Sequence, residues 1–144
     1  MLFRKPKRVV KRILIVEDEP LVAFDNETML ADEGYEVVAT VDKFRTAIQV
    51  LDREQVDLVL CDVRLHDDQS GIRLAKEACK RGIPVLFATA HVPPEADKLA
   101  VGCLIKPYNQ RMLKAALESV NRHLRGKRPK PPKGLELYPR APAD

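Results

Sequence analysis

The residues most capable of chemistry in this chain are three acids, a threonine and a lysine, each of which follows or closes a short apolar segment. They are Glu17 and Asp18 after residues 13–16, Asp62 after 56–61, Thr89 at the end of 83–89, and Lys106 after 101–105. Two carboxylates about 4 Å apart repel each other by roughly 4 kcal/mol at an effective dielectric of 20, so acids that meet need positive charge nearby. Mg²⁺, which prefers oxygen ligands, would supply one such charge and Lys106 another.

Five apolar segments must position these residues, and helical patterns separate them. The segments are ILIV (13–16), YEVVAT (35–40), VDLVLC (56–61), IPVLFAT (83–89) and VGCLI (101–105). Short, nearly continuous apolar runs are typical of parallel strands covered on both faces. We therefore predict an α/β protein with a doubly wound, five-stranded parallel sheet. In such sheets ligands bind beyond the carboxyl ends of the strands, so the acids, the threonine and the lysine are expected to meet there.

Several residues mark helix boundaries. Pro20 suits the start of the first helix, Gly34 the position after its end, and Asp42 and Ser70 the caps of the second and third. Residues 95–100 leave room for barely two turns, so we expect a shortened fourth helix. One apolar face predicts a last helix from about Asn109 to Leu124.

Four segments carry a family resemblance. ILIVEDEP, DLVLCDVRL, FATA and IKP, in this order and spacing, resemble the CheY-like receiver domains of bacterial response regulators over residues 11–124. The resemblance implies a flavodoxin-like fold with strand order 2-1-3-4-5. It also implies a stand-alone phosphoacceptor protein of a two-component system rather than an enzyme, with at most self-catalysed phosphotransfer and autodephosphorylation.

The resemblance assigns a role to each matching residue. Asp62 would accept a phosphoryl group from a histidine kinase or a histidine phosphotransfer protein. Thr89 and Lys106 would each bind an oxygen of that group. The Mg²⁺ ligands would be Glu17, Asp18, Asp62 and the backbone carbonyl of Arg64. The signal would then pass by contact with a downstream protein target.

The sequence departs from the family at the switch position. Cys103 stands three residues before Lys106, where most receivers carry a Tyr or Phe that swings inward when the threonine moves. With LFATA and the short fourth helix, this resembles in part the single-domain FAT-GUY subgroup, named for a Phe-Ala-Thr motif. The glycine and aromatic residue that follow its threonine are replaced here by Ala90, His91 and Val92. We expect phosphorylation to order the 90–100 loop instead.

Two further residues are candidates for tuning the lifetime of the phosphoryl group. Arg64 and His91 lie two residues past Asp62 and Thr89, positions that border the phosphoryl group in receivers. The remaining histidines, His66 and His123, have no paired spacing, so we expect no histidine metal site.

Each candidate residue also has a purely structural interpretation. A lone Asp at a strand end is most often a turn or cap residue, and Thr89 would suit a strand as a β-branched residue. Lys106 would suit a solvated strand end. Glu19 is assigned to the helix N-terminus, where the macrodipole favours negative charge. The combined set favours the chemical interpretation over these separate ones.

Charge is divided unevenly along the chain. The net charge is +4, with six Lys/Arg and no acid in residues 1–12 and a net +5 in residues 121–144, which leaves −7 for residues 13–120. We expect a basic arm (1–10), one receiver domain (11–125) and a flexible, proline-rich basic tail (126–144). An acidic body is not the profile of a DNA-binding domain.

Cysteine usage and hydropathy bear on location. Cys61, Cys79 and Cys103 are scattered and odd in number, which argues against a disulfide scaffold. No apolar run approaches the roughly 18 residues of a membrane span, and no signal-peptide pattern is present. We expect a cytoplasmic protein.

Other functions were weighed against this interpretation. The basic tails would also suit binding to nucleic acid or another anionic surface, which would weaken steeply with salt. A phosphatase with an aspartyl nucleophile would need an acid two residues after Asp62, where this chain has Arg64. A receiver that has lost phosphotransfer is disfavoured because the full set of site residues is present.

Overall fold

The computed structural model describes residues 8–65 and 70–139. In that part of the chain, strands alternate with helices, and a last strand follows the last helix. The strands are β1 (Arg12–Val16), β2 (Glu36–Val41), β3 (Leu58–Asp62), β4 (Val85–Thr89), β5 (Gly102–Ile105) and β6 (Leu135–Leu137). The helices are α1 (Pro20–Asp32), α2 (Phe44–Arg53), α3 (Ser70–Lys80), α4 (Ala96–Leu99) and α5 (Gln110–Leu124).

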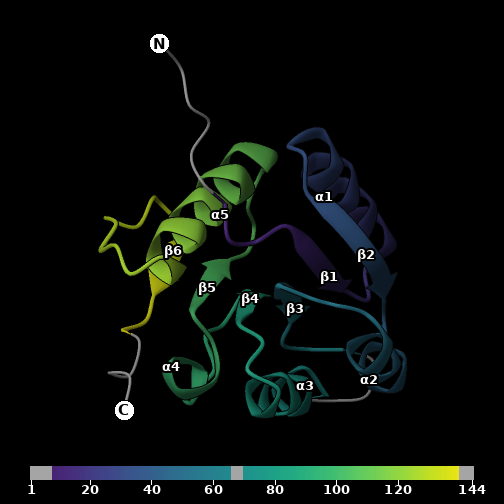
Figure 1. The fold of residues 1–144 in the computed structure, drawn as a ribbon. Helices are drawn as coiled ribbons and strands as arrows, with labels where there is room; N and C mark the ends of the chain where they lie inside the picture. The colour runs from purple at the N-terminus through teal and green to yellow at the C-terminus, as the bar shows by residue number, and fades with distance from the viewer. Residues whose placement is uncertain (1–7, 66–69, 140–144) are drawn as a thin grey trace.

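The strands form one sheet in the order β2-β1-β3-β4-β5-β6 (Figure 1). The first five are parallel, and their order confirms the predicted 2-1-3-4-5 arrangement. β6 lies at the sheet edge and runs antiparallel to β5, with Glu136 opposite Cys103. The expected count of five strands is therefore corrected to six.

The sixth strand falls within residues 126–144, for which we expected a flexible tail. Leu135 is buried in the apolar cluster that includes residues of α5, and Leu137 packs against the same cluster. The strand was not predicted because its three residues, LEL, lie in a segment that otherwise consists largely of prolines and charged residues. Burial of two leucines and pairing with β5 hold the segment at the sheet edge.

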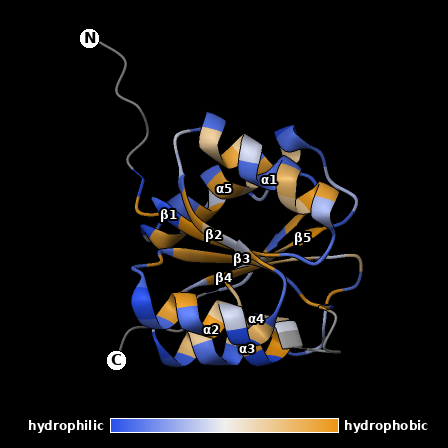
Figure 2. Ribbon diagram, turned by 90° about the vertical axis from the view of Figure 1, so that its right-hand side faces the viewer, coloured by the Kyte–Doolittle hydropathy of each residue, from blue (hydrophilic) through white to orange (hydrophobic). Residues whose placement is uncertain are grey.

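Helices cover both faces of the sheet (Figure 2). α1 and α5 pack on one face, whereas α2, α3 and α4 pack on the other. All residues of β3 and β4 are buried, which explains the nearly continuous apolar runs from which these strands were predicted. None of the helices in the described ranges is long and apolar enough to cross a bilayer.

The observed helix boundaries agree with some of the predicted start and stop residues and not with others. Pro20 is the first residue of α1, and Gly34 follows the helix with a φ of +88°, a conformation that glycine adopts readily. The side chain of Asn109 accepts a hydrogen bond from the N–H of Met112 at 2.8 Å and caps α5. The prediction for Asp42 is wrong, because Lys43 occupies the N-cap position of α2 and no side chain caps it.

Two other helices bear on the site. Ser70, which we expected to cap α3, is instead the first residue of the helix, and its side chain lies outside what the structure describes. α4 has four residues, in agreement with the expected short fourth helix.

The start of the described chain is anchored to α5. The backbone N–H groups of Val9 and Val10 donate to Asn121 Oδ1 at 3.0 and 2.9 Å. The Asn121 amide in turn donates to Tyr35 Oη at 3.1 Å and to the carbonyl of Leu117 at 3.0 Å. Residues 9 and 10, which we placed in the basic arm, therefore bind to the folded domain.

Candidate functional site

The candidate site lies at the carboxyl-terminal end of the parallel strands. Glu17 follows β1, Asp62 ends β3 and Lys106 follows β5. The Lys106 ammonium donates hydrogen bonds to Glu17 Oε1 at 2.8 Å and to Asp62 Oδ2 at 3.2 Å. Residues separated widely in sequence thus form one charged cluster, as the parallel-sheet prediction required.

The two carboxylates of this cluster are removed from water. Glu17 is 4% exposed and Asp62 is 8% exposed. Burial raises the pKa of Glu17 to about 7, the hydrogen bond from Lys106 opposes this rise, and the neighbouring Asp62 adds to it. The site therefore favours positive charge beyond that of the lysine.

The pKa of Lys106 is also raised, but by its acidic neighbours and not by burial. Burial alone would lower the pKa of its ammonium, but the hydrogen bond and charge of Glu17, together with the charge of Asp62, outweigh burial. The pKa of Lys106 lies above its ordinary value as a result. The ammonium stays charged at neutral pH and remains directed at the Asp62 carboxylate.

The acids also fit a divalent cation. Glu17, Asp18 and Asp62 each offer a carboxylate oxygen, and these oxygens lie within 4.8 Å of one another. A set of hard oxygen donors is what Mg²⁺ prefers. The N–H of Arg64 donates to Asp62 Oδ1 at 3.1 Å, so the Arg64 backbone lies beside this carboxylate. Its carbonyl as a further ligand stays a prediction.

The hydroxyl of Thr89 is engaged within its own loop. It donates to the backbone carbonyl of His91 at 3.1 Å and lies 3.3 Å from the His91 N–H, which donates to it. Thr89 is 6% exposed, whereas His91 is exposed. Binding to a phosphoryl oxygen would therefore exchange these two local hydrogen bonds for a new one.

Comparison with known proteins shows which family has this arrangement. The family model described as the response regulator receiver domain matches residues 13–118, most of the chain. This chain belongs to that family. Receiver domains are signalling modules of two-component systems, and the acidic cluster is consistent with their use of Mg²⁺.

Similar proteins are longer than this receiver. It is 35% identical over 116 residues to the transcriptional regulatory protein PdtaR of Mycobacterium tuberculosis, a match covering 76% of this chain and 56% of PdtaR. It is 36% identical over 118 residues to the transcriptional regulatory protein ZraR of Escherichia coli, covering 77% of this chain and 26% of ZraR. The chain thus spans about half, or less, of the length of these relatives.

Solved structures agree with the fold. The response regulator PhyR from Brucella abortus superposes with a TM-score of 0.69 at 32% identity, covering 83% of this chain and 51% of PhyR. A CheY-like receiver domain protein from Methanospirillum hungatei gives a TM-score of 0.69 at 27% identity, covering 81% of this chain and 95% of that one.

A glycine that sequence reasoning missed also shapes the receiver site. A Cβ at Gly71, in the first turn of α3, would lie 2.2 Å from the carbonyl oxygen of Asp62 and 2.6 Å from that of Val63. Only a residue without a side chain allows α3 to start so close to the end of β3. The signal available in the sequence was a glycine directly after the expected cap at Ser70.

The switch position is filled differently from the usual receiver. Cys103 is fully buried, and burial raises the pKa of its thiol to about 12, with Glu136 adding to the effect. Tyr138, which follows β6, packs against the same apolar cluster as Cys103. An aromatic side chain from a later segment of the chain thus lies against the cluster that contains Cys103.

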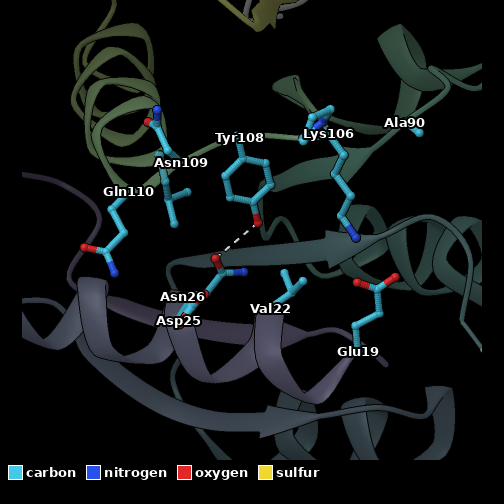
Figure 3. Close-up of a pocket in the computed structure, with 11 residues that line it drawn as sticks. Glu19, Val22, Asp25, Asn26, Ala90, Lys106, Tyr108, Asn109 and Gln110 are labelled. Atoms are coloured by element: carbon cyan, nitrogen blue, oxygen red, sulfur yellow. Dashed lines mark hydrogen bonds between the residues drawn. The ribbon is translucent and has the colours of Figure 1, made fainter.

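A cavity of about 640 Å³ adjoins the site on the α1 side. Lys106 and Glu19 line its end nearest the acids, and Tyr108 and Asn26 point toward one another within it (Figure 3). The Tyr108 hydroxyl donates to Asn26 Oδ1 at 3.1 Å. Nothing in the sequence pattern drew attention to these two residues.

The histidines take separate positions. His91 borders Thr89, and Nε2 of His123 lies 2.8 Å from the carbonyl oxygen of Tyr138. His66 lies outside the described residues. No histidine belongs to the acid cluster found within the described ranges.

Proposed function

We propose that this receiver accepts a phosphoryl group on Asp62 from the phosphohistidine of a histidine kinase or a histidine phosphotransfer protein, and that it acts in the cytoplasm. The observation that carries the proposal is the buried Asp62 carboxylate held between the Lys106 ammonium and two further acids. An Asp62 oxygen would form the new bond to phosphorus as the bond from phosphorus to the histidine nitrogen breaks. The freed imidazole keeps that electron pair.

Charge neutralisation is the main requirement of such a transfer. Lys106 is placed to bind an oxygen of the incoming group, because its ammonium already lies 3.2 Å from Asp62 Oδ2. Glu17, Asp18 and Asp62 would hold Mg²⁺, which when bound neutralises negative charge on the phosphoryl oxygens. Thr89, at the end of the neighbouring strand, would bind a further oxygen after leaving His91.

The phosphodonor would dock over α1. Leu21 and Phe24 are 81% and 67% exposed, and Val22 lines the cavity that runs to Lys106. Apolar side chains this exposed next to a reaction site indicate a surface covered by a partner. Phe24→Ala should therefore slow transfer from a protein donor about tenfold, yet leave transfer from acetyl phosphate unchanged, because that small donor needs no docking surface.

Arg64 and His91 would tune the lifetime of the phosphoryl group. Both residues are exposed and lie beside Asp62 and Thr89 respectively. Each is thus placed to affect the approach of the water that hydrolyses the acyl phosphate. The half-life of the phosphorylated protein should change in Arg64→Ala and in His91→Ala, and two unchanged half-lives would remove both residues from this role.

The loop that follows Thr89 would transmit the signal by changing its conformation on phosphorylation. The Thr89 hydroxyl would give up its hydrogen bonds with His91 and bind a phosphoryl oxygen instead. This change would reposition residues 90–100. Amide hydrogen exchange in residues 90–100 should slow in the presence of a beryllofluoride–Mg²⁺ mimic of the phosphoryl group. Identical protection with and without the mimic would contradict this part of the proposal.

The proposal as a whole is tested with a panel of radiolabelled histidine kinases. At least one kinase should transfer label to the wild-type receiver within seconds to minutes, and none should label Asp62→Asn. Label that survives the substitution would show that another residue is the acceptor.

A further inference from the structure

Residues 134–139, called the strap below, occupy the exposed edge of β5. At one end the N–H of Ile105 donates to the carbonyl of Gly134 at 2.8 Å, and at the other the N–H of Tyr138 donates to the carbonyl of Val101 at 2.9 Å. Between them β6 pairs antiparallel with β5. The edge of β5 is therefore capable of binding an extended segment, and here the strap fills it.

The β5 edge has a feature that suits close approach by another backbone. A Cβ at Gly102 would lie 2.4 Å from the carbonyl oxygen of Glu136 and 3.2 Å from Leu137 Cδ2. Any side chain at this position would push the strap away from β5. Gly102 thus admits a neighbouring strand that no other residue would allow.

The contact of Tyr138 with the apolar core holds the strap, but it leaves the tyrosine hydroxyl unsatisfied. The Tyr138 ring packs against the apolar cluster that contains Cys103. Its hydroxyl is buried and makes no hydrogen bond of normal geometry to the described residues, although the Glu136 side chain lies near it. A buried hydroxyl without a partner lowers the stability of the docked state relative to a released one, in which water satisfies it. A three-residue strand with such a defect belongs to the less stable parts of a fold.

A short path of backbone hydrogen bonds joins the strap to the phosphoacceptor site. The N–H of Lys106 donates to the carbonyl of Thr89 at 2.8 Å, and the N–H of the adjacent Ile105 donates to Gly134. Thr89 and Lys106 are the two residues expected to bind the phosphoryl oxygens. A shift of Lys106 on binding the phosphoryl group would move the adjacent Ile105, whose N–H is hydrogen-bonded to the first residue of the strap.

We propose that phosphorylation of Asp62 releases the strap and that the uncovered edge of β5 binds an extended segment of a partner protein. This inference rests on the proposed phosphoacceptor function. The strap itself shows the chemistry of that segment. Leu135 and Leu137 enter the apolar cluster on one face of the sheet, and the aromatic Tyr138 follows directly and packs against the cluster on the other face. Binding would occur by addition of a strand, in which backbone hydrogen bonds give affinity and side-chain pockets give specificity.

The release step is tested by NMR-detected amide exchange of the full chain with and without acetyl phosphate and Mg²⁺. The amides of Ile105 and Tyr138 should exchange at least about tenfold faster in the phosphorylated protein, and unchanged or slower exchange would overturn the proposal. Tyr138→Phe removes the unpartnered hydroxyl while keeping the ring. It should slow exchange of the same amides in the unphosphorylated protein about tenfold, and faster exchange would show that the hydroxyl is not a defect.

The partner step is tested with a fluorescent peptide of residues 132–139. The peptide should bind the phosphorylated receiver and not the unphosphorylated one, as measured by anisotropy. Gly102→Ala should abolish this binding, because its Cβ would meet the peptide backbone. Binding that persists in the variant would place the surface elsewhere. A phosphorylated protein that dimerises in sedimentation and excludes the peptide would show that a second copy fills the edge, and so overturn the choice of partner.

Intact mass, recorded on the same samples, separates this inference from the proposed function. A sample that gains no phosphoryl group contradicts the phosphoacceptor role. A sample that gains one but keeps the strap amides protected contradicts the release alone.

Discussion

Lys106 donates a hydrogen bond of 2.8 Å to Glu17, a residue 89 positions earlier in the chain, and one of 3.2 Å to Asp62. A single cation thus lies against two buried carboxylates. Removing this cation would take away the ammonium that lies against the Asp62 carboxylate. Under the proposed function, this ion pair would position the lysine for the phosphoryl group as well as stabilise the buried carboxylates.

Replacement of this cation should impair the chemistry. In Lys106→Met we expect the initial rate of phosphorylation by acetyl phosphate to fall about 100-fold, because a positioned donor to the developing charge is lost. Lys114→Met is the matched control, since Lys114 forms a half-exposed surface pair with Glu33 at 3.5 Å. Rates are measured by intact mass against time. Equal rates in the two variants would remove Lys106 from the reaction.

The close approach of α3 to β3 makes a second prediction. Gly71→Ala should slow phosphorylation at least about tenfold. Its Cβ would lie only 2.2 Å from the carbonyl oxygen of Asp62 and would therefore displace the Asp62 backbone. Gly82→Ala is the control: its Cβ would meet no atom within 4 Å, but its φ of +71° disfavours alanine. It should lose about 1 kcal/mol of unfolding free energy with no change in rate. A Gly71→Ala protein with a normal rate would show that the contact does not position Asp62.

The cysteines offer a test by chemical labelling. Cys79 is exposed, whereas Cys61 and Cys103 are buried. Burial, reinforced by nearby acids, raises the pKa of both buried thiols, that of Cys103 to about 12, so neither forms the reactive thiolate near pH 8. Iodoacetamide at pH 8 should label Cys79 alone, and labelling of Cys103 should stay slow as pH rises toward 12 until the fold opens. Peptide mapping that finds Cys103 modified as fast as Cys79 would contradict the burial of Cys103.

Much of the fold followed from short-range pattern. β3 and β4 have all residues buried, so their apolar runs were visible directly, and Pro20 and Gly34 marked the ends of α1 by conformational preferences that act locally. The apolar face of residues 109–124 indicated α5. The site followed from topology, because the carboxyl ends of parallel strands must meet. The proximity of Glu17, Asp62 and Lys106 was therefore predictable from the sequence.

Other features depend on contacts that pattern does not encode. β6 gains its stability from burying Leu135 and pairing with β5, and nothing in a three-residue LEL among prolines indicates either. Asp42 has the right type for a helix cap, yet the chain begins α2 one residue too late for it. Gly71 and Gly102 are required by the approach of a second backbone, which only three-dimensional structure reveals.

The central claim is that Asp62 is the phosphoacceptor, and intact mass spectrometry tests it most directly. The wild-type protein and Asp62→Asn are incubated with acetyl phosphate and Mg²⁺ under the same conditions. The wild type should gain the mass of one phosphoryl group and the variant should gain none. A wild type that remains unmodified, or a variant modified to the same extent, would contradict the account.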